Sequence, residues 1–566
     1  MDALMLIWLV LPILLIHSLW SARKAIQRHK SELAATFGLP PQKGEQEDFQ
    51  SISAYWRQLK EHKPSPRSVD DITWNDLDMD QVFRRINICQ TSPGEEVLYA
   101  RLRALADLEA GWEEGLAALE ADPDMRLAIQ VLLYQMGKSD DNGIPELAAS
   151  AADESLPHPL LIRICSYLPF AAILLSIFYL PIGIILLIAS LAINGGLSYW
   201  GKKKLRGRLH TAAYASSLLW CAKKLARLSM PGLESFKNRL MQYIKPFAHL
   251  GGALSRVVRQ TVSIGDMSGI ITMFQIFLLL DLKGYNRAMS AFTRHREALE
   301  GLYNTIGDLD VLIAVLSFRK SLPFYCQPQF GKALTLDFQA MTHPLLDGGI
   351  ANSLSLHRGA LITGSNASGK STFIKAVAVN CILAQAIHTC CAKVFILPHA
   401  RVLSSMALRD SLTGGDSYFV AEIKSFRRIL DAARQTPCLC FVDEILRGTN
   451  TIERIAASAA VLSALQKENS LCLVATHDIE LTQILQSQYD NYHFREHLEN
   501  GAVRFDFILH PGPSRTRNAI LLLDVMGFPH KVIERAQTMV SAFEADHSWP
   551  PFEMENAIRQ ERGNAS

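Results

Sequence analysis

The fold of the C-terminal half of this chain is decided by the stretch Gly359-Ala360-Leu361-Ile362-Thr363-Gly364-Ser365-Asn366-Ala367-Ser368-Gly369-Lys370-Ser371-Thr372. It starts as a short apolar run, passes through a loop with two glycines and continues into a helical stretch at 373–386. Strand, glycine loop and helix are the context that the pattern GxxxxGK[ST] requires. Both glycines permit backbone angles that turn N–H groups toward a phosphate, and the helix N-terminus adds partial positive charge. The stretch therefore predicts a phosphate-binding loop in an α/β domain.

The loop also predicts which residues hold the nucleotide. Lys370 should reach the β- and γ-phosphates of ATP, and the Ser371 hydroxyl should bind Mg²⁺. ATP and Mg²⁺ are the expected cofactors, and nothing in the sequence indicates another small-molecule substrate. The expected nucleotide contacts in the loop are Gly364, Ser365, Asn366, Ala367, Ser368, Gly369, Lys370, Ser371 and Thr372.

A second apolar run, at 438–442, ends in two carboxylates, Asp443 and Glu444. At the end of a strand beside the phosphate loop, Asp443 would hold the Mg²⁺ shell. Glu444 would orient and polarise the attacking water as a general base. An apolar strand that ends in Asp-Glu is common, so the catalytic interpretation depends on its pairing with the phosphate loop.

Two more segments complete the candidate site. A further strand-like run, 471–476, ends at His477, where a γ-phosphate sensor is needed; the alternative is a structural histidine. Ser417 opens an amphipathic helix that reaches Leu430, and it serves either as an N-cap or as an anion-binding hydroxyl at a helix N-terminus. In ATPases that sandwich nucleotide between two subunits, such a helix completes the partner's site. The predicted catalytic residues are Lys370, Glu444 and His477.

These pieces, in this order, resemble the ATPase domain of the MutS family of DNA mismatch-repair proteins. The resemblance implies ATP hydrolysis by a homodimer in which Ser417 acts across the interface on the partner's γ-phosphate. Residues 510–536 look like the dimerising C-terminal end of the family. The motifs that carry the resemblance are Asn366, Ser417-Tyr418-Phe419 with Glu422, Asp443-Glu444-Ile445-Leu446-Arg447-Gly448-Thr449-Asn450-Thr451, and Ala475-Thr476-His477.

The resemblance is strong over about 323–543 and fainter over 70–319, where Gln90–Glu96 looks like the start of the family's helical core, or lever, domain. The family begins with a mismatch-reading domain and a connector domain, and we expect neither in the residues before Asp70. Their Phe-x-Glu wedge is represented only by Phe494-Arg495-Glu496, which we interpret as incidental. The likeness is therefore to MutS-related membrane proteins, and mismatch recognition by the family's usual route is not expected.

Two apolar segments predict membrane spans. Residues 3–22 carry no Asp, Glu, Lys or Arg, and Arg23 and Lys24 follow at once. This order is typical of an uncleaved anchor with its N-terminus outside rather than of a signal peptide. Residues 164–201 also carry no charge, and one span needs about 20 residues. They predict two spans joined near Tyr179–Gly183, with a buried soluble hairpin as the alternative.

A third apolar stretch, 267–280, is short and contains Gln275, which favours a buried core helix. Two crossings by the hairpin keep the segments before and after it on one side of the membrane. The basic run at 202–204 places that side in the cytoplasm. The expected location is thus an inner or plasma membrane, multi-pass, with a cytoplasmic ATPase domain and lipid as a partner.

Composition sets the outer bounds. A chain of 566 residues should form two or three domains, and 49% hydrophobic residues is high for a soluble protein with 20% charged ones. The net charge of +2 favours no particular partner. Ten cysteines without a CxxC pair indicate buried free thiols in a reducing compartment.

The predicted fold class is a C-terminal α/β P-loop NTPase domain of the ABC or MutS type, with an all-α lever or core domain and transmembrane helices. The predicted divisions are a transmembrane anchor (1–22), a linker (23–69), a first helical part (70–160), a transmembrane hairpin (161–201), a second, lever-like helical part (202–322), the ATPase domain (323–545) and a disordered tail (546–566).

Two functions remain open at this stage. One is a dimeric ATPase of the MutS type that binds mismatched or branched DNA at the membrane, which rests mainly on the family resemblance. The other is a membrane-anchored, ATP-driven mechanochemical or signalling switch that binds no DNA. The sequence names neither the process nor the partner proteins.

Overall fold

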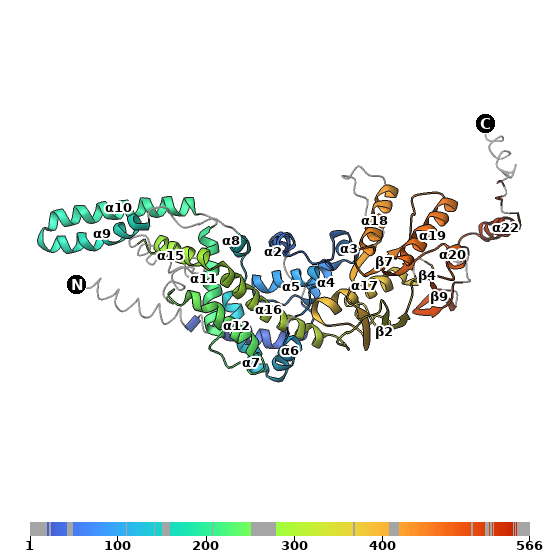
Figure 1. The fold of residues 1–566 in the computed structure, drawn as a ribbon, viewed down its shortest axis with the longest axis horizontal. Coiled ribbons are helices and arrows are strands. Elements are labelled where there is room, and N and C mark those ends of the chain that lie inside the picture. Colours follow the sequence, from blue (N-terminus) through green and yellow to red (C-terminus); the bar gives the residue numbers. More distant parts are fainter. Residues whose placement is uncertain are drawn as a thin grey trace, which may run out of the picture. The chain divides into compact units, whose positions relative to one another are not determined.

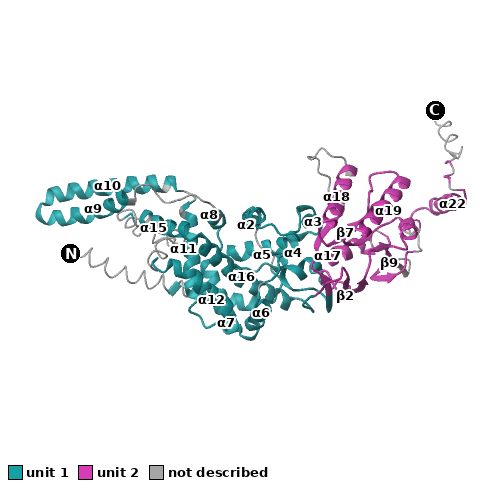
Figure 2. Cartoon of the chain, in the orientation of Figure 1, with its two compact units in different colours: residues 1–329, 344–347, 379–395 teal, residues 330–343, 348–378, 396–566 magenta. Residues whose placement is uncertain are grey.

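The computed structural model describes residues 20–21, 24–41, 49–108, 110–140, 142–149, 159–205, 208–250, 279–365, 368–406, 418–499, 502–514, 520, 523–524, 526–546, 548–549 and 551. The predicted N-terminal anchor lies outside them apart from Trp20 and Ser21, as do 267–278 and most of the tail. Two compact units make up the chain (Figure 2). The first contains 1–329, 344–347 and 379–395, and the second contains 330–343, 348–378 and 396–566.

The first unit is built of helices (Figure 1). Its central element is the long helix α16, which is buried almost continuously from Thr305 to Arg319. The helices are α2 (Phe49–His62), α3 (Asp71–Asp76), α4 (Met79–Ile86), α5 (Ser92–Ala104), α6 (Trp112–Ala121), α7 (Pro123–Met136), α8 (Ile144–Ala149), α9 (Pro159–Phe178), α10 (Leu180–Lys204), α11 (Arg208–Leu225), α12 (Glu234–Ile244), the 3₁₀ turn η1 (Lys245–Phe247), α15 (Leu280–Arg294) and α16 (Arg296–Ser321).

The start of α5 is fixed on α16 by a buried carboxylate. Asp310 accepts hydrogen bonds from the Thr91 backbone N–H (2.9 Å), the Thr91 hydroxyl (2.7 Å) and the Gln90 N–H. A Cβ on Gly94 would lie 2.4 Å from Asp310 Oδ2, and one on Gly307 would lie 2.6 Å from a methyl carbon of Val97. The glycines let the two helices approach closely, and the carboxylate satisfies N–H groups at a helix start that have no partner inside the helix.

One sequence-based expectation changes in this unit. Within the range where the sequence predicts a linker, residues 49–62 form helix α2, which packs against α5. Ile52, Tyr55 and Trp56 are buried at helical spacing. Three apolar residues on one face are enough to dock a helix whose remaining surface is polar, and the average composition of the segment conceals that face.

Helices α9 and α10 run along one another as a hairpin (Figure 1). They are separated at Tyr179, inside the predicted junction. A Cβ on Gly183 would lie 2.3 Å from the Ser176 Cα, so the two backbones touch there. Large apolar side chains face outward, among them Ile177 and Phe178, which are 72% and 74% exposed.

Four described helices are long and apolar enough to cross a membrane: α9, α10, α16 and α17 (Lys370–Ile387). They differ in what surrounds them. The apolar windows of α16 and α17 are 89% and 83% buried within the protein, whereas those of α9 and α10 are 28% and 17% buried. Only the hairpin leaves its apolar surface uncovered among these four.

The second unit has the α/β texture that the sequence predicts. A six-stranded sheet has the order β10-β9-β4-β8-β7-β6, parallel throughout except for the antiparallel β10, and a four-stranded sheet has the order β1-β5-β2-β3. The strands are β1 (Gln329–Gly331), β2 (Leu336–Met341), β3 (Asn352–Leu356), β4 (Ala360–Thr363), β5 (Val394–Pro398), β6 (Arg401–Ser405), β7 (Cys438–Asp443), β8 (Ser470–Ala475), β9 (Asp490–Glu499) and β10 (Ala502–Pro511).

The central strands of the larger sheet are covered on both faces. All residues of β4 and β8 are buried, which explains why they are continuous apolar runs rather than alternating ones. Phe426 and Ile429 of α18 and Leu462 and Leu465 of α19 share one core with strands β7 and β8. The helices of this part are the first half of α17 (residues 370–378), α18 (Tyr418–Ala433), α19 (Thr451–Lys467), α20 (Ile479–Ile484) and α22 (His530–Asp546).

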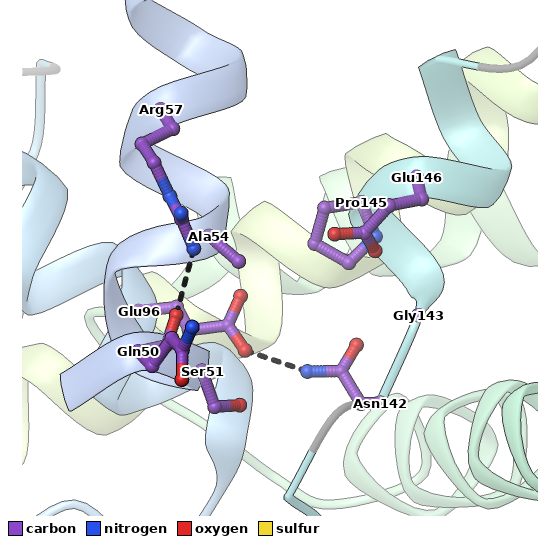
Figure 3. A pocket seen from close by; sticks show the side chains of 9 residues that line it. All are labelled: Gln50, Ser51, Ala54, Arg57, Glu96, Asn142, Gly143, Pro145 and Glu146. Atoms are coloured by element: carbon purple, nitrogen blue, oxygen red, sulfur yellow. Dashed lines mark hydrogen bonds between the residues drawn. The ribbon is translucent and has the colours of Figure 1, made fainter. Parts of the chain in front are cut away.

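The helical unit contains a polar cavity of about 330 Å³ beside α2, α5 and α8 (Figure 3). Glu96 lies at its buried end and accepts hydrogen bonds from Asn142 Nδ2 and the Tyr303 hydroxyl, each at 2.6 Å. Burial raises the pKa of Glu96 to about 8, although both hydrogen bonds oppose the shift. At neutral pH this carboxyl is therefore mostly protonated.

Replacing Glu96 by Gln should flatten the dependence of stability on pH. The folded chain keeps the Glu96 proton up to about pH 8, whereas the unfolded chain releases it near 4.5. Its contribution is therefore fully present below 4.5 and is lost as the pH rises toward 8, by at most roughly 1.4 kcal/mol per pH unit. The measurement is the apparent melting temperature of the full chain in detergent between pH 5 and 8.

The matched control is Glu61→Gln, which changes an exposed carboxyl on α2 that does not line the cavity. This variant should show the same dependence of melting temperature on pH as the wild type. Equal slopes in the wild type and Glu96→Gln would show that Glu96 is ionised in the folded protein.

Candidate nucleotide site

The phosphate loop begins where β4 ends and closes at the start of α17. Gly364 and Gly369 have φ angles of 143° and 94°, which side chains disfavour. A Cβ on Gly364 would also lie 2.9 Å from the Phe494 carbonyl oxygen, and one on Gly369 would lie 3.0 Å from the Phe507 ring. Both positions therefore need glycine for backbone angle and for the close approach of the β9–β10 hairpin.

Lys370, the first residue of α17, turns its ammonium back into the loop. Its Nζ donates to the carbonyl oxygens of Gly364 (2.6 Å) and Ser365 (2.7 Å) and lies 3.2 Å from His477 Nε2. Burial lowers the pKa of Lys370 to about 8, against the opposing effect of Asp443, Glu444 and Glu496. The result is a nearly buried cation that nearby carboxylates keep protonated at neutral pH.

The ends of three neighbouring parallel strands bring the other predicted residues to this loop. Asp443, the last residue of β7, is in register with Ala475 at the end of β8. The Glu444 N–H donates to the Ala475 carbonyl, and the Thr476 N–H donates to the Ile362 carbonyl of β4, both at 3.0 Å. The carboxyl ends of parallel strands form the usual ligand-binding edge of such a sheet.

Glu444 is held by two cationic or polar neighbours. Its Oε1 lies 3.1 Å from His477 Nε2, and its Oε2 contacts Arg447 Nε. Burial raises the pKa of Glu444, but the His477 hydrogen bond and the positive charges of Arg447 and Lys370 outweigh burial and lower it overall. Its φ of 57° is in the left-handed region, which turns the side chain at the strand end.

The loop after Glu444 is anchored by α18. Glu422 is 5% exposed, and burial raises its pKa although the nearby backbone N–H groups of Gly448 and Arg447 act in the opposite direction. A Cβ on Gly448 would lie 2.9 Å from the Phe419 Cβ of the same helix. The helix that begins just after Ser417 thus contacts the loop that carries the partner of Glu444.

The next helix, α19, starts with a regular cap. The Asn450 side chain accepts from the Glu453 N–H at 2.9 Å, and Thr449 donates to the Glu453 carboxylate. Arg454 then forms two hydrogen bonds to Asp478, of 3.0 and 2.6 Å. This pair joins α19, which follows β7 in the chain, to the residue after His477, which follows β8.

The structure places most of the predicted site residues. The structure brings Gly364, Ser365, Lys370, Glu444 and His477 together by direct contacts. Asp443 lies close enough for its charge to act on Lys370. Ser368 donates to the Ser365 carbonyl at 2.7 Å and closes the loop, while Ser371 and Thr372 occupy the first turn of α17. Asn366, Ala367 and Ser417 lie outside the described residues, and their expected roles stay predictions.

Three contacts were not predicted. Arg447 and Glu422 belong to the motifs quoted from the sequence, but no role was predicted for either. Glu496 was interpreted as part of an incidental triplet. Arg447 is three residues from Glu444, a spacing that could have suggested the pairing. Glu422 and Glu496 come from other elements and depend on long-range packing, for which the local sequence holds no signal.

The donor set suits a magnesium nucleotide. Hydroxyl and carboxylate oxygens, here Ser371 and Asp443, are the ligands that Mg²⁺ prefers, and Mg²⁺ is usually bound by one or two protein groups plus phosphates. Among the described residues there is no group of three or more His, Cys, Asp or Glu side chains that could hold a metal by itself.

A parallel sheet with a glycine loop and lysine after one strand and a carboxylate pair after another defines a nucleotide-binding domain of the P-loop class. Residues 360–544 match the family model for MutS domain V. This match covers β4 through α22, and so includes the phosphate loop, the Asp443–Glu444 pair and His477.

Curated relatives agree with this assignment. The chain is 32% identical over 275 residues to DNA mismatch repair protein MutS 2 of Haloarcula marismortui, covering 43% of this chain and 29% of the relative. It is 30% identical over 259 residues to DNA mismatch repair protein MutS of Thermus thermophilus and 31% identical over 257 residues to that of Thermus aquaticus, each covering 44% of this chain and 31% of the relative. The chain is thus homologous to MutS proteins over less than half its length and spans about a third of theirs.

Replacing Gly448 by Ala should disturb the site through α18. The added methyl would lie 2.9 Å from the Phe419 Cβ, so α18 or the loop must shift, at a cost of about 1–3 kcal/mol. We expect a lower apparent melting temperature, measured by heating the full chain in detergent.

The control is Gly331→Ala on strand β1, where a Cβ would meet no atom within 4 Å. It should leave the melting temperature within about a degree. A Gly448→Ala protein as stable as the wild type would mean that the loop and α18 are not in contact.

Proposed function

We propose that this chain binds and hydrolyses ATP as a dimeric, membrane-anchored protein of the MutS type. The observation that carries the proposal is the convergence of Lys370, Glu444 and His477 within hydrogen-bonding distance at the ends of parallel strands. These residues follow three different strands, and a structural network alone would not require a buried lysine in a glycine loop. Their chemistry fits the transfer of a phosphoryl group to water.

The residues around the loop have defined tasks in this proposal. The N–H groups of the phosphate loop and the Lys370 ammonium bind the phosphates, and Ser371 and Asp443 hold Mg²⁺. The metal, when bound, neutralises negative charge that develops on the phosphates. Lys370 must then exchange the carbonyl oxygens of Gly364 and Ser365 for phosphate oxygens.

Glu444 is the proposed general base. The lowered pKa of Glu444 keeps it ionised at neutral pH, as accepting a proton from water requires. Arg447 fixes one carboxylate oxygen, and His477 contacts the other while it also contacts Lys370. A phosphate that binds Lys370 would therefore change the contacts of His477 and, through His477, those of the base Glu444.

The dimer is proposed from the resemblance to the MutS family. Ser417 would act on the nucleotide of the partner subunit, and α18, which begins at the next residue, contacts the loop after Glu444 through Glu422. Closure of a dimer on ATP requires that ATP bind the closed form more tightly than the open one.

The membrane assignment is supported by the hairpin. Helices α9 and α10 contain 20 and 25 residues, and a span needs about 20 residues. Their apolar side chains face outward, and Lys203 and Lys204 follow at the end of α10. A bilayer would cover this surface and place the basic end in the cytoplasm.

Two substitutions test the ATPase proposal. Lys370→Ala should weaken ATP binding by at least tenfold, because it removes the buried cation of the phosphate loop. Glu444→Gln should keep ATP binding and reduce turnover by a factor of about 10²–10⁴, the usual contribution of a general base. Binding is measured by calorimetry and turnover by phosphate release, with the full chain in detergent. Unchanged affinity and turnover in Lys370→Ala would refute the assignment.

The Glu444→Gln protein also tests the dimer. With ATP and Mg²⁺ it should elute from gel filtration at twice the protomer mass, and without ATP it should shift toward the monomer. A monomer that ignores ATP would remove the dimer from the proposal and leave the ATPase intact.

DNA binding is the second candidate function, favoured by the names of the relatives, which are DNA mismatch repair proteins. Contacts to phosphates would make the affinity for duplex or branched DNA fall steeply with salt. We expect retention on DNA at low salt that decreases as salt increases, measured by fluorescence anisotropy with the full chain in detergent. Absence of binding at any salt concentration would favour a membrane switch that does not bind DNA.

A further inference from the structure

Glu496 lies against the phosphate loop, although the sequence gives it no role. It belongs to β9, and its carboxylate accepts a hydrogen bond from the hydroxyl of Ser365. Its charge also acts on Lys370, where it adds to the effects of Asp443 and Glu444. A third carboxylate therefore borders the place where the proposed function requires phosphates.

The sheet holds Glu496 in this position. Strand β9 pairs in parallel with β4, and Thr363, the last residue before the loop, is in register with His493. Immediately beyond that pair, Gly364 packs on the Phe494 carbonyl so closely that a Cβ would lie 2.9 Å from it. The backbone that carries Glu496 is thus packed directly against the loop.

The neighbouring carboxylates have tasks in the proposed function, which assigns none to Glu496. Asp443 is the proposed metal ligand, and Glu444 is the proposed base, held by Arg447 and His477. Neither metal binding nor proton transfer in the proposed function uses Glu496. Ser365 links Glu496 to Lys370, because its hydroxyl donates to the Glu496 carboxylate and its carbonyl oxygen accepts from Lys370 Nζ at 2.7 Å. The negative charge of Glu496 therefore lies close to the place where phosphates would bind.

We propose that Glu496 sets the nucleotide affinity of the phosphate loop, because its negative charge beside Ser365 and near Lys370 repels phosphate and so penalises nucleotides according to their negative charge. The inference rests on the proposed function and deepens it. Glu496 acts through Lys370 and Ser365 and makes no bond to the reacting atoms, so it is a specificity-determining residue rather than a catalytic one. Its effect should be larger for ATP than for ADP and absent for adenosine.

The experiment uses Glu496→Gln, which removes the charge and keeps an oxygen that can accept the Ser365 hydrogen bond. Equilibrium binding of ATP, ADP and adenosine to the full chain in detergent is measured by calorimetry at low and high salt, with Mg²⁺ present. We expect ATP affinity to rise by roughly three- to tenfold, as removal of one partly screened charge predicts, and the gain to shrink at high salt.

Glu468→Gln is the matched control. Glu468 pairs with Arg434 and precedes β8, at the opposite end of the strand from the phosphate loop, so this variant should keep wild-type affinities. Equal ATP affinity in the wild type and Glu496→Gln, or an equal gain for adenosine, would overturn the inference. The proposed function fails separately, if the wild type itself binds no ATP or if Lys370→Ala binds it equally well.

Discussion

The parallel pairing of β4 with its neighbours β8 and β9 is the constraint on which the site depends. It places the loop after β4 between the end of β8 and the middle of β9, two strands that lie more than a hundred residues further along the chain. The hydrogen bond from the Thr476 N–H to the Ile362 carbonyl fixes His477 beside Lys370, and β7 then adds Asp443 and Glu444 one strand further on. If the register of β4 on β8 slipped by one residue, the side chains of β4 would turn to the other face, and the loop that carries Lys370 would no longer meet His477 in the same way.

The sequence predicted the parts of the site that short local patterns encode. A glycine loop after a strand, a carboxylate pair after a strand and a histidine after a strand each have a short pattern, and the sheet brings them to one edge. Glu422 and Glu496 have no such pattern. They reach the site because α18 and β9 pack there, and the residues next to them in the sequence do not encode this packing. Phe494-Arg495-Glu496 shows the difficulty: as a motif it is incidental, and as part of β9 it borders Lys370.

The sequence likewise predicted those parts of the fold that have a local pattern. The α/β and helical textures follow from hydrophobic periodicity, and a glycine-proline junction located the turn of the hairpin near Tyr179. Helix α2 was missed because three buried residues dock an otherwise polar segment. Length and mean hydropathy alone do not separate α16 and α17 from α9 and α10, but the uncharged run at 164–201 distinguishes the hairpin from α16, which contains Asp308 and Asp310. Their surroundings separate them as well: α16 and α17 are enclosed by protein, and the hairpin is not.

The charges around the loop explain why a magnesium ion belongs to the proposal. Lys370 and Arg447 supply two positive charges, whereas Asp443, Glu444 and Glu496 supply three negative ones, so these side chains together carry a net charge of −1 with His477 neutral. Such a set does not attract a polyphosphate by side-chain charge alone. Backbone N–H groups and the N-terminus of α17 must contribute, and a divalent cation beside Asp443 would reverse the sign of the local charge. Affinity for a nucleotide would therefore depend more on the metal and the loop backbone than on the lysine alone.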